Sequence, residues 1–201
     1  MKKLFAYGGI AASIVMIAFG IGSIATGALG IGTVRDNLSQ EQIYFGDASE
    51  DEAVPASLSG EHVTTGAEAR EFAKVMRHHA LDSSGGLVYA EMGRFTAKPD
   101  APKSATDGNG GTSDEKYALI DEQTGEPVSN GARNLWVTET ALSTALNTAF
   151  FAERVAVFSI VMGVALLLTG IGFLVLTLGG ALGIVPLPKR LAKFQAASVT
   201  H

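Results

Sequence analysis

Residues 134–186 read NLWVTETALSTALNTAFFAERVAVFSIVMGVALLLTGIGFLVLTLGGALGIVP, and this stretch decides the fold. No charged side chain occurs between Val155 and Leu187. The apolar core of a bilayer is about 30 Å thick and takes roughly 20 helical residues to cross. We therefore expect a transmembrane helix over 155–187. The amphipathic ramp over 134–154 is expected to be a stalk helix that leads into it.

A second apolar segment lies near the N-terminus. Residues 4–34 carry no charge and follow a short basic start, residues 1–3. The apolar region of a secretory signal peptide is shorter, about 7–15 residues. We therefore expect a first, uncleaved transmembrane helix over 4–34. Cleavage after the small residues 25–28 is the alternative.

The charges are divided sharply along the chain. All 20 acidic residues lie between Asp36 and Glu153, and the segment from Arg35 to Arg154 holds 10 basic residues, which gives it a net charge of −10. The two ends hold only basic residues: Lys2, Lys3, Lys189, Arg190 and Lys193. Basic residues beside apolar spans stay cytoplasmic. We therefore expect both termini, with the basic tail 188–201, in the cytoplasm and an acidic domain, 35–154, outside. An acidic exterior disfavours nucleic acid as a partner.

The chain has no cysteine, which excludes disulfides and thiolate metal sites. The external domain must therefore be stabilised by its own core, by the membrane or by self-association. Its patterns predict a continuation of the first helix over 35–43 and a helix over 67–81 capped by Thr65 or Thr64 and ended by Gly85-Gly86. A short helix is expected over 87–95, a loose loop over 96–115 and a short strand or turn near 117–120.

Small residues form a stripe on each apolar segment. On the first, Gly22, Thr26 and Gly30 are spaced by four. Small residues at helical spacing let two helix backbones approach closely in lipid, although glycine is also simply common in membrane helices. The second stripe consists of Ser159, Gly163 and Gly170. We expect the two stripes either to face each other or to face another protomer.

The ramp is poor in charge and rich in small polar residues, which indicates a helix packed against protein. Its candidate core or partner-facing residues are Leu135, Trp136, Leu142, Leu146 and Phe150. We expect the ramp to pair with the continuation of the first helix over 35–43.

No motif points to a reaction. His78 and His79 are adjacent, so on a helix they point about 100° apart and do not chelate one metal together. The stretch 107–115 has the composition of a calcium loop without its ligand spacing. No charge lies within either apolar segment, which disfavours a stand-alone carrier or pump. We therefore expect no catalytic residue, metal or cofactor.

Three stretches of the chain resemble small two-span membrane proteins of actinobacteria. They are VRDNLSQEQI (34–43), EAREFAKVMRHHALDSSGGLVYAEMGRF (68–95) and residues 130–178, of which GARNLWVTETALSTALNTAFFAERVA (131–156) is the most distinctive. The resemblance covers most of the chain outside 98–111 and implies a two-pass envelope protein. Such proteins sometimes carry the label of aromatic ring-opening dioxygenase. We interpret that label as an error, because a non-haem iron site needs two histidines and a carboxylate that converge.

The expected fold is mainly α: a two-helix transmembrane hairpin whose helices extend into a small extracytoplasmic helical domain with long loops. The expected function is that of a non-enzymatic plasma-membrane protein, either a self-associating scaffold or an accessory subunit, with membrane lipid and itself or another membrane protein as partners. One alternative is a homo-oligomeric pore lined by Thr26, Thr169 and Thr177. Another is a sensor that binds a lipid or small molecule between the stalk and a Phe72–Met76–Met92–Phe95 cluster.

Overall fold

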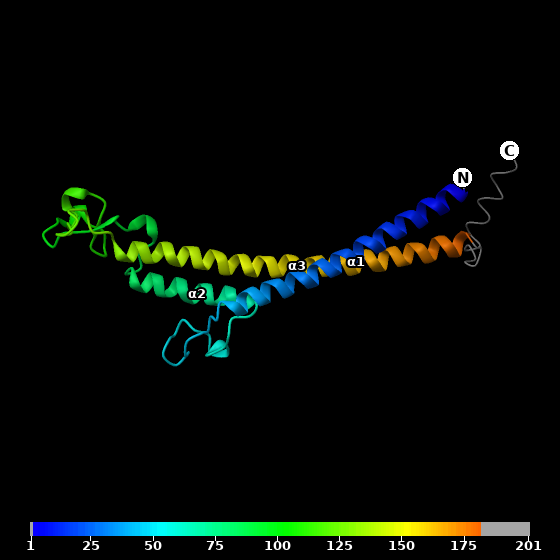
Figure 1. Cartoon of the computed structure of the whole chain (residues 1–201), viewed down its shortest axis with the longest axis horizontal. Coiled ribbons are helices and arrows are strands. Elements are labelled where there is room, and N and C mark those ends of the chain that lie inside the picture. The colour runs from blue at the N-terminus through cyan, green and yellow to red at the C-terminus, as the bar shows by residue number, and fades with distance from the viewer. Residues whose placement is uncertain (1, 182–201) are drawn as a thin grey trace. The chain divides into compact units, whose positions relative to one another are not determined.

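The computed structural model describes residues 2–181 of the chain, which is mainly helical. The α-helices of this part are α1 (Lys2–Gln40), α2 (Gly66–Ser83) and α3 (Gly131–Ala181), as Figure 1 shows. Residue 1, the end of the predicted second span (182–187) and the predicted basic tail (188–201) lie outside the described residues.

Two of the helices, α1 and α3, are long and apolar enough to cross a membrane. The chain divides into two compact units. The first joins Met1–Gly30 with Val155–His201, and the second is Ile31–Arg154. We call the described parts of α1 and α3 in the first unit the apolar hairpin, and the second unit the middle domain.

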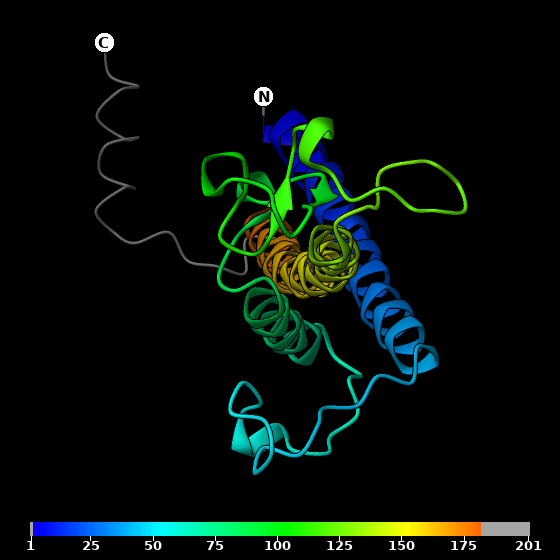
Figure 2. The ribbon, with the colours of Figure 1, turned by 90° about the vertical axis from the view of Figure 1, so that its left-hand side faces the viewer.

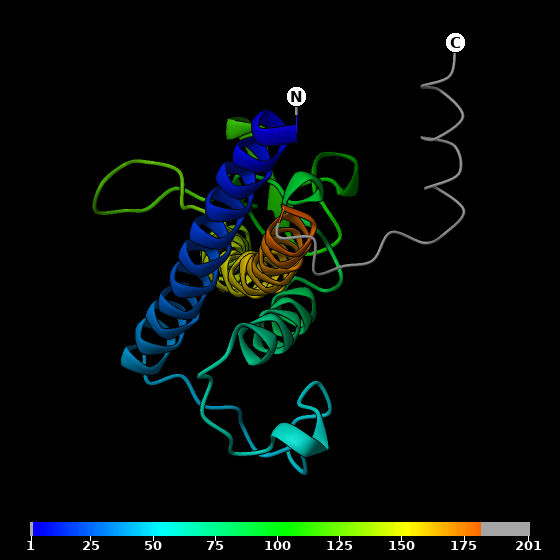
Figure 3. The same cartoon turned by 90° about the vertical axis from the view of Figure 1, so that its right-hand side faces the viewer.

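The apolar hairpin is antiparallel. Gly9, near the start of α1, lies against Thr177, near the end of α3, whereas Gly27 lies against Ala156. Figure 3 shows the blue start of α1 beside the orange end of α3. Ser13, Gly20 and Gly27 of α1 are buried, as are Ala156, Gly163 and Gly170 of α3. Both sets repeat every seven residues, which is the period of helices that wind around each other.

The middle domain is built on a core shared by three helices and one loop. Its buried members are Leu38 of α1, Phe45, Val54 and Val63 of the connecting segment, Ala69, Ala73 and Val75 of α2, and Leu146 of α3. Figure 2 shows α2 alongside α3 and, in cyan, the segment that joins α1 to α2. That segment includes one 3-10 turn, Ala56–Leu58. The end of α1 and the ramp of α3 therefore contribute to the same core.

Helix α2 begins and ends with the signals expected from its sequence. The Thr65 hydroxyl accepts a hydrogen bond from the Glu68 N–H at 3.3 Å, and the Glu68 carboxylate accepts one from the Thr65 N–H at 2.9 Å. This reciprocal capping satisfies two N–H groups that the first helical turn leaves without partners. At the other end, Gly85 and Gly86 adopt φ angles of 65° and 83°, where glycine is favoured. The predicted helix over 67–81 is confirmed.

The segment from Ser84 to Asn130 differs from the expectation. The predicted helix over 87–95 is reduced to a 3-10 turn, Tyr89–Glu91, followed by strand β1 (Phe95–Thr96). Strand β2 (Gly111–Thr112) pairs antiparallel with β1, so the loop predicted over 96–115 contains a strand. Two further 3-10 turns occupy Lys103–Ala105 and Glu115–Tyr117. The second one overlaps the start of the strand or turn expected near 117–120.

A single carboxylate organises this segment. Asp107 accepts hydrogen bonds from the backbone N–H groups of Gly93, Asn109 and Gly111. Burial by itself would raise the pKa of Asp107, but the hydrogen bonds from these three N–H groups lower it below its ordinary value. The Asp107 oxygens thus hold together three backbone segments of this acidic, glycine-rich loop.

We predict that Asp107→Asn loosens this segment selectively. An amide oxygen accepts fewer and weaker hydrogen bonds than a carboxylate, a loss of about 1–2 kcal/mol. The backbone amides of Gly93 and Gly111 should then exchange hydrogen about tenfold faster, while those of α2 stay unchanged. Hydrogen exchange of the full chain in detergent measures both.

The wild-type segment should also loosen in acid. Because the pKa of Asp107 is lowered by folding, its stabilisation is complete above the unfolded value of about 4 and is lost as the pH falls through the folded value. In Asp107→Asn this pH dependence should disappear. Equal exchange rates in both proteins at neutral pH would contradict the assignment.

Candidate functional site

The closest approach in the apolar hairpin occurs where glycine faces backbone. A Cβ atom added at Gly20 would lie 2.7 Å from the Leu167 N and 2.8 Å from the Gly163 O. One added at Gly163 would lie 2.7 Å from the Gly20 O. No side chain fits at such distances, so glycine is required at both positions. Gly27 and Gly170 repeat this pattern one heptad away, against Ala156 and Ile17.

The residues expected on the second small-residue stripe lie in different surroundings. Gly163 and Gly170 are buried against α1, whereas Ser159, one turn before Gly163, is half-buried. The Ser159 hydroxyl donates to the Val155 carbonyl of its own helix at 3.0 Å. Two of the three residues of this stripe thus face α1.

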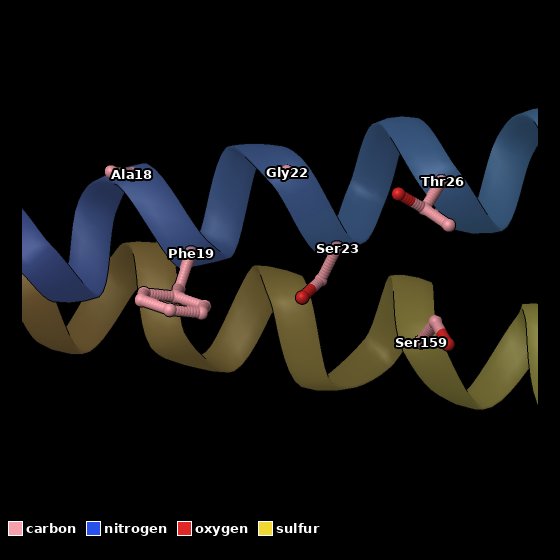
Figure 4. Close-up of a pocket in the computed structure, with 6 residues that line it drawn as sticks. All are labelled: Ala18, Phe19, Gly22, Ser23, Thr26 and Ser159. Carbon is pink, nitrogen blue, oxygen red and sulfur yellow. The ribbon is translucent and has the colours of Figure 1, made fainter.

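The first stripe mostly faces away from α3. Gly30 packs against the Ala156 methyl group, but a Cβ atom at Gly22 would have nothing within 4 Å. Thr26 is exposed. Figure 4 shows Ala18 and Gly22 on the side of α1 away from α3, whereas Phe19 and Ser23 point toward it. The structure therefore does not bring Gly22 together with the stripe of α3.

We define the Gly22 face as Ala18, Gly22 and Thr26, three residues on one side of α1. It forms part of a shallow groove of about 500 Å³ on the surface of the apolar hairpin. Phe19, Ser23 and Ser159 complete the lining. The sequence leaves open that this stripe faces another protomer, and the place of the Gly22 face on the surface of the apolar hairpin is compatible with that alternative.

The residues of α1 that pack against α3 repeat every seven residues, whereas the expected stripe repeats every four. Ser13, Gly20 and Gly27 alternate with Ile10, Ile17, Ile24 and Ile31, which are also spaced by seven. This alternation of a small and a β-branched residue is visible in the sequence. It is the sequence signal for the face of α1 that contacts α3.

The threonines of the pore alternative are not arranged as one polar surface. Thr177 lies against Gly9 inside the apolar hairpin. The Thr169 hydroxyl donates to the Ala165 carbonyl of its own helix at 2.7 Å. Threonine commonly makes this bond within a helix.

The ramp divides into a buried and an exposed side. Trp136 and Leu146 are each 6% exposed, and Phe150 is half-buried. Leu135 and Leu142 are 45% and 49% exposed. Glu139 is only 4% exposed, and its Oε1 lacks a hydrogen bond among the described residues. The ramp is thus packed against protein on one side only.

One carboxylate joins the three helices of the middle domain. Glu153 of α3 accepts a hydrogen bond from the Arg35 Nε of α1 at 3.2 Å and another from the Gly66 N–H of α2 at 2.9 Å. Its side chain is 12% exposed, so the ion pair is only partly screened by water. The second bond also places a negative charge at the N-terminus of α2, where the helix dipole favours it.

An apolar groove lies between these helices. It has a volume of about 780 Å³. Its lining consists of Val34, Asn37, Leu38, Glu41 and Ile43 from α1 and the residues after it, Phe72 and Met76 from α2, and Leu142, Ala145, Leu146, Thr148, Ala149 and Ala152 from α3. We call this the apolar groove.

The expected Phe72–Met76–Met92–Phe95 cluster is wrong as a single unit. Phe72 and Met76 pack against the core of the middle domain, whereas Met92 belongs to a separate cluster with Ala80 and Trp136. Phe95 lies in β1. The cause is the end of the helix at residues 84–86, because α2 stops before it reaches Met92 and Phe95.

His78 and His79 each contact a nearby acidic side chain. His79 Nε2 lies 2.8 Å from an oxygen of Asp51, and His78 Nε2 lies 3.2 Å from one of Asp82. Among residues 2–181 no group of three or more acidic or histidine side chains is placed to hold a metal ion.

Comparison of the chain with protein-family models, with curated proteins and with solved structures finds no match.

We predict that Gly27→Leu destabilises the apolar hairpin. A Cβ atom there would lie 2.5 Å from the Ala156 carbonyl oxygen, so the helices must separate. The melting temperature in mild detergent should fall by about 2–12 °C, the effect of overpacking by 1–3 kcal/mol. Gly172→Leu is the matched control, because nothing lies within 4 Å of that position. Equal melting temperatures for the two variants would rule out the packing described.

Proposed function

We propose that the chain is a non-enzymatic membrane protein of the cell envelope that acts as a self-associating scaffold or as the accessory subunit of a membrane complex. The observation that carries the proposal is the Gly22 face. It presents small residues on α1 while the opposite, glycine-lined side of the same helix is already used by α3.

The physical argument concerns what drives helices together in lipid. Lipid tails are as apolar as leucine, so helix association depends on close van der Waals packing. Ala18, Gly22 and Thr26 are spaced by four and offer a flat surface to another helix. A second copy or another membrane protein can therefore approach here without displacing α3.

The proposed orientation places both termini in the cytoplasm and the middle domain outside. Its support is the charge distribution. Lys2, Lys3, Lys189, Arg190 and Lys193 flank the apolar segments, whereas residues 35–154 carry a net charge of −10. The surface of the middle domain would then be acidic and extracytoplasmic.

We predict that Gly22→Leu dissolves the assembly and leaves the fold intact. Wild-type protein is extracted from its native membrane in mild detergent, and its mass is determined with identification of every polypeptide present. Several identical chains would support the scaffold, and a reproducible second polypeptide would support the accessory subunit. The leucine side chain would hold the partner helix away, so Gly22→Leu should run as a monomer.

Gly172→Leu again serves as the control, since it adds the same side chain to an open position of α3. It should retain the wild-type mass. The melting temperature of monomeric Gly22→Leu should stay near that of the control, which separates loss of assembly from loss of fold. A wild-type protein that is a monomer in the membrane extract, or an unaltered assembly in Gly22→Leu, would refute the proposal.

A further inference from the structure

We propose that the apolar groove of the middle domain holds one acyl chain of a membrane phospholipid. Its volume of about 780 Å³ falls in the range of roughly 300–1,000 Å³ typical of small-molecule sites. The proposal depends on insertion of α1 and α3 into a membrane. It does not depend on self-association through the Gly22 face.

The lining suits a chain that forms no hydrogen bonds. Most of it is aliphatic, and Phe72 and Met76 add an aromatic ring and an adaptable thioether. The polar members are Asn37, Glu41 and Thr148. The Thr148 hydroxyl already donates to the Thr144 carbonyl at 2.7 Å. A polar ligand would therefore find few partners, whereas an acyl chain needs none.

The groove is open along an exposed rim. Leu142 is 49% exposed, and Ala145 and Ala152 are also exposed. Apolar surface of this kind is stabilised when another apolar group covers it. The deeper part is closed by Leu38 and Leu146, each 6% exposed. A narrow, flexible chain fits such a site better than a second folded surface does.

Continuity with the apolar segments points to a lipid as the source of that chain. Val34 is the last residue of the uncharged segment 4–34, and Ala152 precedes Val155, the start of the other, by three residues. Both line the groove. Arg35 follows Val34 directly, with a side chain that is 55% exposed. Its Nε is paired with Glu153, and the remaining N–H groups of its guanidinium are suited to the phosphate of the same lipid.

The test uses the full chain in vesicles of phosphatidylglycerol and phosphatidylethanolamine. The vesicles contain a phospholipid with a photoactivatable diazirine at the end of one acyl chain. After illumination, the labelled peptides are mapped by mass spectrometry. Label on the α2 peptide that contains Phe72 and Met76 is expected, in addition to label on the apolar hairpin.

Two matched variants make the test specific. Ala145→Trp places a large side chain into the groove from its rim, and Ala141→Trp places the same side chain on an exposed position outside the lining. Label on α2 should fall about fivefold in Ala145→Trp and stay unchanged in Ala141→Trp, because only the first variant occupies the site.

Equal label on α2 in the two variants would overturn the proposal, as would label confined to the apolar hairpin in wild-type protein. Cross-links between two copies at the groove, with no lipid on α2, would also overturn it in favour of a second copy as occupant. Label that persists on α2 in Gly22→Leu would support the lipid site independently of the scaffold function.

Discussion

The close approach of two helix backbones at Gly20 and Gly163 is the constraint on which the apolar hairpin depends. A side chain at either position would collide with a carbonyl oxygen of the other helix. Because Gly27 and Gly170 repeat the contact one heptad away, the glycines fix both the antiparallel direction and the register of α1 against α3. In the middle domain, Glu153 has the corresponding role, since it binds Arg35 of α1 and the first N–H of α2 together.

The sequence predicts what local chemistry determines. Uncharged runs predict the two long apolar helices, and a threonine at 64 or 65 predicts the start of α2. The packing face of α1 is harder, because both sides of that helix carry glycine. Spacing by four favours Gly22, whereas the structure uses Gly20 and Gly27, which are spaced by seven. Local spacing does not choose between these sides, since the choice depends on the partner helix.

The segment from Ser84 to Asn130 depends on contacts that are distant in the sequence. Asp107 binds the N–H of Gly93, and the Asn130 amide donates to the Gly93 carbonyl at 2.9 Å. The Asn130 oxygen also accepts from the Ala132 N–H at the start of α3. These bonds override the weak helical pattern over 87–95. The apolar groove is unpredictable for the same reason, as its lining comes from three helices.

The central claim is that α1 and α3 of one chain pack through their glycine faces, which leaves the Gly22 face for a partner. The chain has no cysteine, so a disulfide can form only between cysteines that are introduced. The Ala156 Cβ lies 3.2 Å from the Cβ position of Gly30, a few tenths of an ångström inside the roughly 3.5–4.5 Å separation of a disulfide. Oxidation of Gly30→Cys/Ala156→Cys in membranes should give a disulfide within one chain, which leaves the mass of one chain. Gly22→Cys/Ala156→Cys should give no disulfide within one chain. Failure of the first pair to cross-link, or a cross-link only at the mass of two chains, would contradict the account.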